Sequence, residues 1–598
     1  MLLLLAATVL LIFSSLSIGI VIHRLLEKTF GAQLPCDLFC LLLLGVMTST
    51  VYFDLISLWF PTDWRSLIPL LAAGIAIVLI LPRSAGQIAA RIRQNVHYFF
   101  SGPRLPITIV ALLVFVFYWL LPPANSDSRD YHYTTIRLYE KYKVIPGLAN
   151  IHGRYALNNA SFLIQAAWSF TSLIGRPVYA LNGVLLAALF AGLLKRSFYA
   201  PGLLLGFIYA SLLCVLCTPL LVNISSPSSD SLVAVCVAWP LLLLTEQAVL
   251  QPRLGSGKLA PQLIPLLILL FSITAKLSSF PVLVVVACSL ICLPPKQRPI
   301  ASWLKIGGIA ALLYAPWLLR NYIMTGYLVY PFPYLNLFHP DWQLPLSVQH
   351  LDLYFLNVET KKVSGTTFSN PPTFPHWLLP WVENFFDEGT PLDPLFFLVG
   401  ILSPLAWIPV FRSRHRQLLP FLLWIIVYLG LWTAFLACPV LRYFAVLLCF
   451  SLVIPGLAFA LPAARQQQAT ASKDRRSPNS PVFRLLTPLY ILAAIYYLAS
   501  GYRKPSNYPI SLGQCFIYPP KDKVNVLYDS QKQLPTFPYK YLGHGVKLYI
   551  QDTAHFCAGI DQPCTVTDYG DLEMRGPRLE DGVRMIHDKV LERFPEAR

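Results

Sequence analysis

Charged residues are scarce in this sequence, and acidic residues are the scarcer sign. Asp, Glu, Lys and Arg make up 13% of the 598 residues, with 29 acidic against 46 basic side chains and a net charge of +17. Walker, Rossmann and HExxH patterns are absent, and no repeat of fixed period occurs. These absences argue against ATP-driven transport and zinc-dependent proteolysis. Apolar residues are in excess, at 56%.

The apolar residues gather in runs of about 17 to 24, the length that crosses the ~30 Å hydrocarbon core of a bilayer as an α-helix. The runs predict an all-α polytopic membrane protein with about fourteen transmembrane helices. The predicted spans are 2–22, 37–60, 66–82, 105–121, 178–194, 202–222, 230–250, 261–275, 278–293, 301–319, 392–411, 417–437, 440–461 and 483–500.

Basic residues are distributed unevenly between the predicted spans. Alternate connections carry 21 Lys and Arg against two acidic residues, Glu27 and Asp474, which assigns those connections to the cytoplasm by the positive-inside rule. The first run has no basic residue before it, whereas Arg24 and Lys28 follow it. We therefore expect an uncleaved first span rather than a signal peptide, and a C-terminus outside. The net charge then reflects topology, and no nucleic-acid partner is expected.

Composition also predicts the domain boundaries. In chain order, these are N-terminal spans with a basic cytoplasmic loop (1–104), the main membrane region (105–460), a flexible cytoplasmic linker (461–482), a last span (483–500) and an extracytoplasmic C-terminal domain (501–598). Within the main region, the outward loops 122–177 and 320–391 are long, and long ordered loops usually carry function. Segments 134–143 and 157–174 have helical spacing and are predicted to lie along the membrane interface.

The C-terminal domain is predicted to be a small α/β unit. Short β-branched and aromatic runs precede a stretch near 579–594 with helical spacing. Cys557 and Cys564 are expected to pair if this domain lies in an oxidising compartment, which leaves Cys515 free.

With this topology, the ionisable residues at the outer ends of the spans fall into one layer. They are Asp127, Asp130, His132, Arg154, Asp230, Lys276, Arg320 and Arg442. A charge beside the hydrocarbon core costs a few kcal/mol unless a partner or a function offsets it. The cations Lys276, Arg320 and Arg442 suit the phosphate of a lipid head group, since the arginine fork matches phosphate oxygens. The alternatives are a snorkelling lysine and interfacial arginine anchors.

The acidic residues of the layer lie in the segment "NSDSRDYHYTTIRLYEKY" after the fourth predicted span. Asp127 and Asp130 stand three residues apart, with His132 two residues further on. Their spacing leaves several roles open: a general base toward a hydroxyl or amine, a ligand of a divalent metal such as Mg or Mn, a partner of Arg129 or Arg154, or a helix cap.

At these residues the chain resembles the polytopic glycosyltransferases of the GT-C class, which use polyprenyl-phosphate-linked sugars at the outer face of the membrane. The matching segments are "SDSRDYH", "SPSSDSLVAVCVAWPLLL", "ITAKLSSFP", "PWLLRNYIMTGYLVYPF" and "LRYF". A further segment, "VIPGLANIHGRYALNNASF" (144–162), is similar to one in an uncharacterised family of bacterial membrane proteins. Two features depart from the GT-C pattern. Four predicted spans precede the acidic loop, where many such enzymes have one, and the acids form D-x-x-D rather than an adjacent pair.

The resemblance implies a GT-C-like fold in the bacterial cytoplasmic (inner) membrane. It implies an inverting sugar transfer from a polyprenyl-phosphate donor to a lipid, protein or polysaccharide acceptor, with Asp127 or Asp130 as general base. No cofactor is implied with certainty, and a divalent metal stays open. The residues implied in addition to the layer above are Tyr131, Asn158 and Asn321, which with Arg154 and Asp230 would contact substrate. The alternatives are an O-antigen ligase or polymerase, a transporter or flippase of a lipid-linked substrate, and a structural subunit of an envelope assembly.

Overall fold

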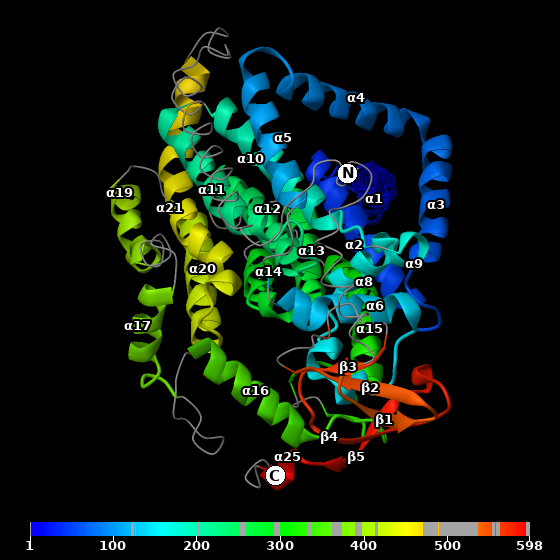
Figure 1. Ribbon diagram of the computed structural model, residues 1–598. Helices are drawn as coiled ribbons and strands as arrows, with labels where there is room; N and C mark the ends of the chain where they lie inside the picture. Colours follow the sequence, from blue (N-terminus) through cyan, green and yellow to red (C-terminus); the bar gives the residue numbers. More distant parts are fainter. Residues whose placement is uncertain are drawn as a thin grey trace.

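The computed structural model describes residues 2–120, 125, 127–175, 177–200, 202–250, 259–291, 300–332, 336–361, 373–388, 398–412, 417–470, 488, 536–552, 557 and 562–593. α-Helices make up most of these residues, and β-strands occur in the described part only from Tyr539 onward. The chain is therefore mostly helical with a small C-terminal sheet region (Figure 1).

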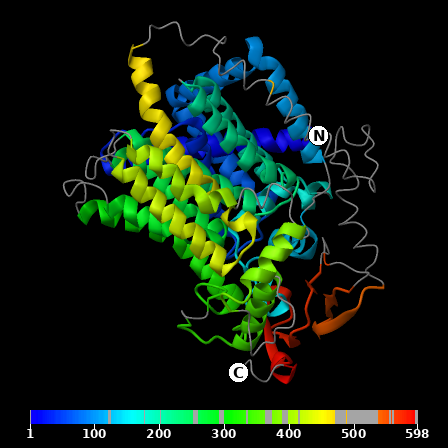
Figure 2. The ribbon, with the colours of Figure 1, turned by 90° about the vertical axis from the view of Figure 1, so that its left-hand side faces the viewer.

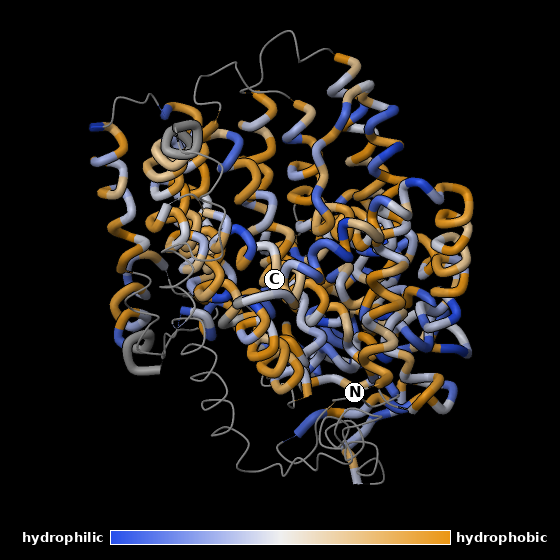
Figure 3. The backbone as a smooth tube through the Cα atoms, turned by 90° about the horizontal axis from the view of Figure 1, so that it is seen from above, coloured by the Kyte–Doolittle hydropathy of each residue, from blue (hydrophilic) through white to orange (hydrophobic). Residues whose placement is uncertain are grey.

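Seven helices in the described part of the chain are long and apolar enough to cross a membrane. They are α1 (Leu2–Phe30), α2 (Leu38–Ile56), α10 (Leu181–Tyr199), α12 (Asp230–Leu250), α15 (Ile300–Thr325), α20 (Leu418–Ala437) and α21 (Leu441–Thr470). Apolar residues cover most turns of the helical tubes (Figure 3). The prediction of an integral membrane protein agrees with these helices.

The other predicted spans have different outcomes. Five coincide with shorter apolar helices, namely α5 (Leu105–Leu120), α11 (Leu203–Val222), α13 (Leu259–Ala275), α14 (Val282–Ile291) and the segment Leu398–Arg412, which includes α19 (Trp407–Arg412). The span predicted at 66–82 forms α3 (Leu67–Ile80), which is bent by 101° from α4 (Pro82–Phe99). The last predicted span, 483–500, lies outside the described residues, so the count of fourteen stays a prediction.

Two further helical predictions fall on the segments between spans. The segments 134–143 and 157–174 form α6 (Tyr133–Lys141) and the pair α8 (Ala160–Ser169) and α9 (Thr171–Ile174). The remaining short helices are α7 (Leu148–Ile151), α16 (Leu346–Lys361), α17 (Leu378–Glu388) and α25 (Val590–Arg593). The flexible linker predicted from residue 461 is wrong at its start. Helix α21 continues to Thr470, because the Ala, Arg and Gln residues there are strong helix formers.

Helices α1 and α2 pack closely because small residues lie at their crossing. A Cβ added to Gly19 would lie 2.1 Å from the carbonyl oxygen of Leu41, and one added to Gly45 would lie 1.8 Å from that of Ser15. Such close backbone approach is the usual way in which membrane helices gain van der Waals contact. This pair anchors the N-terminal part of the bundle.

The C-terminal region contains two small sheets. Strands β1 (Tyr539–Gly543) and β2 (Val546–Ile550) are antiparallel, β3 (Cys564–Thr565) pairs in parallel with β2, and β4 (Gly570–Met574) is antiparallel to β5 (Val583–Asp588). The prediction of a helix near 579–594 is therefore wrong over 583–588, because these residues pair with β4 as strand β5. The predicted pairing of Cys557 with Cys564 is confirmed, and Cys515 lies outside the described residues.

The sheet region docks on the loop that follows α5. The Tyr155 hydroxyl donates to the Cys564 carbonyl at 2.8 Å, and the Thr134 hydroxyl donates to the Cys557 carbonyl. The Val583 N–H donates to the Pro146 carbonyl at 2.9 Å. Figures 1 and 2 show the strands at one end of the helical bundle and α4 at the opposite end.

Candidate functional site

Asp127 lies directly before η3 (Ser128–His132), a π-helical turn that leads into α6. Such turns are rare and occur frequently at functional sites. The Asp127 carboxylate makes no capping hydrogen bond to this turn, so the helix-cap interpretation does not describe it. Instead, Arg442 in the first turn of α21 donates to the carboxylate at 3.0 Å. The acidic loop and the LRYF motif, 315 residues apart in the chain, thus meet in space.

A second ion pair lies beside the first. Lys276 Nζ contacts Asp230 Oδ1 at 2.5 Å, and the two side chains are 15% and 12% exposed. Asp230 is the first residue of α12, and Lys276 occupies the break between α13 and the turn η5 (Leu277–Ser279). A carboxylate in the first turn of a helix is favoured by the free N–H groups there. Asp230 is therefore the partner that offsets the cost of desolvating Lys276.

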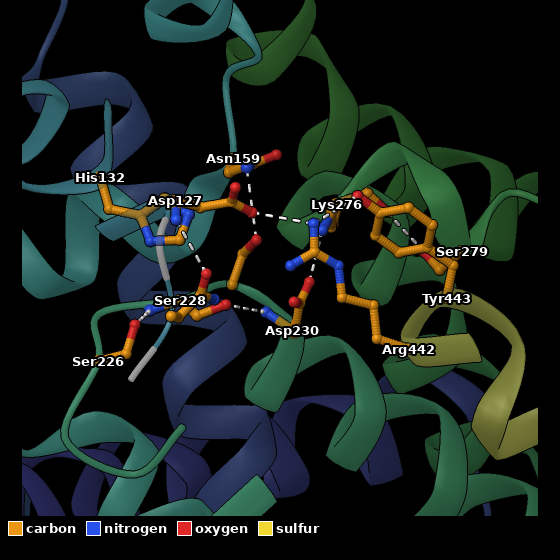
Figure 4. A network of polar contacts seen from close by, with 12 residues as sticks. Asp127, His132, Asn159, Ser226, Ser228, Asp230, Lys276, Ser279, Arg442 and Tyr443 are labelled. Atoms are coloured by element: carbon orange, nitrogen blue, oxygen red, sulfur yellow. Dashed lines mark hydrogen bonds and ion pairs between the residues drawn. The ribbon is translucent and has the colours of Figure 1, made fainter. Parts of the chain in front are cut away.

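Tyr443 joins the two ion pairs. Lys276 Nζ lies 4.4 Å from the centre of its ring, and the Arg442 guanidinium lies 5.1 Å from the same centre. Arg442 also donates to the Tyr443 hydroxyl at 3.2 Å. Figure 4 shows the two cations converging between Asp127 on one side and Tyr443 on the other. Two positive groups and two carboxylates therefore share one small volume.

A serine network holds the acidic turn against the start of α12. The hydroxyl oxygens of Ser128 and Ser226 lie 2.6 Å apart, and Asn182 donates from its amide to the Ser226 and Ser228 carbonyls at 2.7 and 3.0 Å. Asn159 donates to the Ser229 hydroxyl at 3.4 Å (Figure 4). These buried hydrogen bonds fix the relative positions of Asp127 and Asp230.

His132 belongs to this network rather than to the exposed part of the site. It is buried, its Nδ1 lies 3.3 Å from the Ser128 hydroxyl, and its ring contacts Tyr131 and Phe162 at 4.5 and 5.1 Å between centres. Burial lowers the pKa of His132 to about 4, against the raising effect of the Asp127 charge. A neutral, enclosed imidazole positions the turn, and we do not assign it proton transfer.

A small pocket opens beside Arg442 and lies between α12, the η5–α14 segment and α21. Each of these three elements begins at the site with polar residues and contributes apolar residues about one turn further on. The polar lining consists of Asp230, Ser278, Ser279, Arg442 and Tyr443, and the apolar lining of Val233, Ala234, Val237, Pro281, Val282, Val446 and Leu447. The pocket therefore has a charged mouth and apolar walls.

Arg320 does not reach this pocket. It is 1% exposed, its Nε donates to Asn158 Oδ1 at 3.0 Å, and it lies 3.6 Å from the equally buried Asp54 of α2. Trp317 and Asn158 bond reciprocally, indole to carbonyl and amide to carbonyl, each at 2.8 Å. Arg320 thus stabilises the packing of α15 on α2 and on Asn158, and we remove it from the set of donor-phosphate ligands.

Asn158 and Asn321, expected to contact substrate, share this interior. Asn158 has a φ of 51°, in the left-handed region that asparagine tolerates better than most residues. Asn321 is fully buried, and neither atom of its side-chain amide has a partner among the described residues. Both residues lie behind the site rather than at its mouth.

Arg154 and Tyr131 form the side of the site that faces α16. The Arg154 guanidinium lies 5.7 Å from the centre of the buried Tyr131 ring and pairs with Glu359 of α16 at 3.6 Å. Arg154 is 41% exposed, so its charge is accessible.

Asp130 is placed differently. Its charge acts on Tyr155, whose pKa is raised by burial, lowered by a hydrogen bond with Thr134 and raised by Asp130.

The donor set does not fit a divalent metal. Among the residues that the structure describes, no group of three His, Cys, Asp or Glu side chains comes together. The two carboxylates of the site, Asp127 and Asp230, already face Arg442 and Lys276. Mg or Mn would need several oxygen ligands without competing cations, so we derive no step through a metal.

A family model matches residues 1–449, which include Asp127, Asp230, Lys276, Arg442 and the first turns of all three pocket elements. The chain belongs to the family described as "Domain of unknown function (DUF8201)". Comparison with curated proteins and comparison with solved structures give no match. The C-terminal sheet region of this DUF8201 protein lies beyond the matched residues.

Several residues of the DUF8201 site were not expected from the sequence. Tyr443, Ser128 and Ser226 carry no charge, so a search for ionisable groups passes over them, although they lie in the quoted motifs "LRYF", "SDSRDYH" and "SPSSDS". Ser278 and Ser279 follow Lys276 directly and line the pocket mouth. The available signal was a cluster of small polar residues at the ends of apolar runs.

Proposed function

We propose that this protein is a membrane glycosyltransferase that transfers a sugar from a polyprenyl-phosphate carrier to an acceptor at the outer face of the membrane. One observation carries the proposal: Arg442 and Asp230 line one end of a pocket whose other end is apolar, and their ion-pair partners Asp127 and Lys276 lie directly beside them. A lipid-phosphate sugar has the same order of chemical groups, with an apolar chain, an anionic phosphate and a polar sugar. The resemblance to the GT-C class supports the same assignment.

In this proposal the donor phosphate binds between Arg442 and Lys276. Arginine offers a planar fork of N–H donors to phosphate oxygens, and lysine adds a point charge. The first isoprene units would then lie against the apolar walls formed by Val237, Val282 and Val446, and the rest of the chain in the bilayer. Phosphate binding competes with Asp127 for Arg442, so donor binding would release the Asp127 carboxylate.

Asp127 is then the general base. The acceptor oxygen or nitrogen attacks the anomeric carbon while Asp127 removes its proton, and the bond from that carbon to the phosphate oxygen breaks. The bonding electrons leave with the polyprenyl phosphate, whose developing charge Arg442 and Lys276 stabilise. A single displacement of this kind inverts the anomeric configuration. Arg154, whose charge interacts with Asp127, would orient the acceptor.

The proposal includes the topology expected from the basic residues, with the site and the C-terminus outside and the protein in a bacterial inner membrane. Two features support it. The basic helix α4 and the sheet region lie at opposite ends of the bundle (Figure 1), and the disulfide between Cys557 and Cys564 is typical of an oxidising compartment.

The first test is donor binding, with undecaprenyl phosphate as the probe and native mass spectrometry of the purified protein as the readout. We expect Arg442→Gln, which removes a cation from the mouth, and Val446→Phe, which fills the apolar wall, to weaken binding independently. Lys305→Gln is the matched control, because Lys305 is exposed, contacts the Thr29 carbonyl and the Phe30 ring, and does not line the pocket. Equal binding by all four proteins would refute the pocket assignment.

The second test is turnover with a lipid-linked sugar donor. A general base typically contributes about 10²–10⁴ in rate, so Asp127→Asn should lose that factor while Asp130→Asn retains most of its activity. A dead Asp130→Asn beside an active Asp127→Asn would move the base to Asp130. Donor binding without transfer to any lipid, protein or polysaccharide acceptor would instead favour the transporter or flippase alternative.

A further inference from the structure

Helix α4 lies outside the bundle core and is strongly basic. Arg83, Arg91, Arg93 and His97 belong to it, and Arg104 follows it. No acidic residue occurs between Asp63 and Asp127. The charge of this part of the chain is therefore of one sign, and no neighbour in the sequence neutralises it.

The helix has three distinct sides. One side contacts the protein: Ser84 accepts a hydrogen bond from Arg24, Asn95 accepts one from Lys195 at 2.8 Å, and Tyr98 stacks on Tyr199 with ring centres 5.0 Å apart. These residues lie at the helical spacing that places them on a common face. This side fixes the helix on the ends of α1 and α10.

A second side is apolar and open. Ile88, Ile92, Val96 and Phe100 follow one another at four-residue spacing along one line. Ile88 is buried, but Ile92, Val96 and Phe100 are 38%, 50% and 46% exposed. An aliphatic and aromatic line of this kind is unstable in water and stable in the acyl-chain boundary of a bilayer.

The third side is polar and carries Arg83, Gln87 and Gln94, and Arg93 lies between this side and the apolar line; all four are exposed. The bend of 101° between α3 and α4 sets the helix direction. If α3 runs across the bilayer, α4 must run along its surface, with the apolar line toward the acyl chains and the arginines at the level of the head groups. Figure 1 shows α4 extending sideways from the end of α3 across the end of the bundle farthest from the strands.

We propose that α4 is an interfacial helix that binds anionic lipid head groups. The occupant is identified by charge, because basic residues near an anionic membrane surface gain attraction that zwitterionic lipids do not offer, and by the open apolar line beside those residues. The proposal is independent of the sugar-transfer chemistry, since α4 lies at the end of the bundle opposite to the strands.

The test uses the full-length protein in nanodiscs that contain phosphatidylcholine and phosphatidylglycerol. Native mass spectrometry after release counts the phosphatidylglycerol molecules that each protein retains. We expect enrichment of phosphatidylglycerol over phosphatidylcholine by the wild type and a loss of about fivefold per removed arginine in Arg83→Gln/Arg93→Gln. The control Arg578→Gln/Lys589→Gln removes the same charge from the sheet region and should retain the wild-type enrichment.

A third variant separates charge from structure. Arg83→Lys/Arg93→Lys keeps both charges and should keep the enrichment, which also settles the question if the glutamine variant folds poorly. Enrichment that is the same in the wild type and in a folded Arg83→Gln/Arg93→Gln protein would overturn the proposal. So would loss of enrichment in the lysine variant, because a lipid surface recognises the charge and not the arginine fork.

Discussion

Lys276 has two possible roles, as the counter-charge of Asp230 and as a ligand of the donor phosphate, and a double-mutant cycle separates them. Lys276→Met removes the ammonium group and leaves the Asp230 carboxylate, only 12% exposed, without its 2.5 Å partner. Breaking a buried pair in this way costs about 3–5 kcal/mol. We expect the lower end of that range, because both side chains retain some contact with solvent and Arg442 is close by.

The double variant Lys276→Met/Asp230→Asn removes both charges. Loss of a whole buried pair is often neutral or even stabilising, so the second substitution should recover most of the lost stability. The coupling between the two sites should therefore be about 2–3 kcal/mol. Thermal unfolding midpoints in detergent, followed by tryptophan fluorescence, would report the recovery.

Donor binding should not recover with stability. An interaction with a charged group contributes about 1.5–3 kcal/mol, so the double variant should bind undecaprenyl phosphate about 10- to 100-fold more weakly than the wild type. The matched single variant Asp230→Asn keeps the lysine and should bind at least as well as the wild type. A stable double variant with wild-type affinity would refute the role of Lys276 in phosphate binding and leave it as a counter-charge only.

Two further predictions concern charges outside the pocket. Arg320→Met should lower the unfolding midpoint, because Asp54 is left buried and unpaired at a cost of about 3–5 kcal/mol. The double variant Arg320→Met/Asp54→Asn should recover much of this loss. If the folded double variant binds undecaprenyl phosphate more weakly than the wild type, Arg320 belongs to the binding site after all. Burial raises the pKa of Asp352 to about 6, against the lowering effect of hydrogen bonds from Tyr569 and Tyr330 and of the Arg154 charge. The raised pKa means that protonation of Asp352 stabilises the folded protein. This contribution is complete below the unfolded-state pKa of about 3.9 and is lost as the pH rises through 6. Asp352→Asn should accordingly gain stability relative to the wild type between pH 4 and pH 7, and a constant difference between their midpoints would contradict this.

Hydropathy placed the site residues at the ends of apolar runs but did not predict their positions around the bundle. Asp127, Asp230, Lys276 and Arg442 were each placed near the outer end of an apolar run, and the structure joins them in two adjacent ion pairs. Arg320 was assigned to the same layer by the same reasoning, yet it lies in the interior against Asp54. A boundary between apolar and polar residues gives depth only, and the direction in which a side chain faces depends on helix packing.

The sequence did contain one overlooked sign of the Arg320 arrangement. Asp54 lies inside the predicted span 37–60, where an acidic residue requires a partner, and a search for that partner would have directed attention to the buried cations. The uncharged residues were harder to find. Tyr443 became recognisable only when Lys276 and Arg442 were seen on either side of its ring, since an aromatic residue near a helix end is commonplace in membrane proteins.

The contacts between the acidic loop and the C-terminal strands also impose an order of assembly. The hydrogen bond of Thr134 cannot form until Cys557, 423 residues later, has been synthesised, and that of Tyr155 cannot form until Cys564, 409 residues later, has been synthesised. At a synthesis rate of about 5–20 residues per second, that delay is roughly 20–80 s. During this interval every helix that carries a site residue has been made, whereas the turn beside Asp127 still lacks its outer support. A chain that stops before Cys557 would therefore contain all four charged residues of the site but neither of these two contacts to the acidic loop.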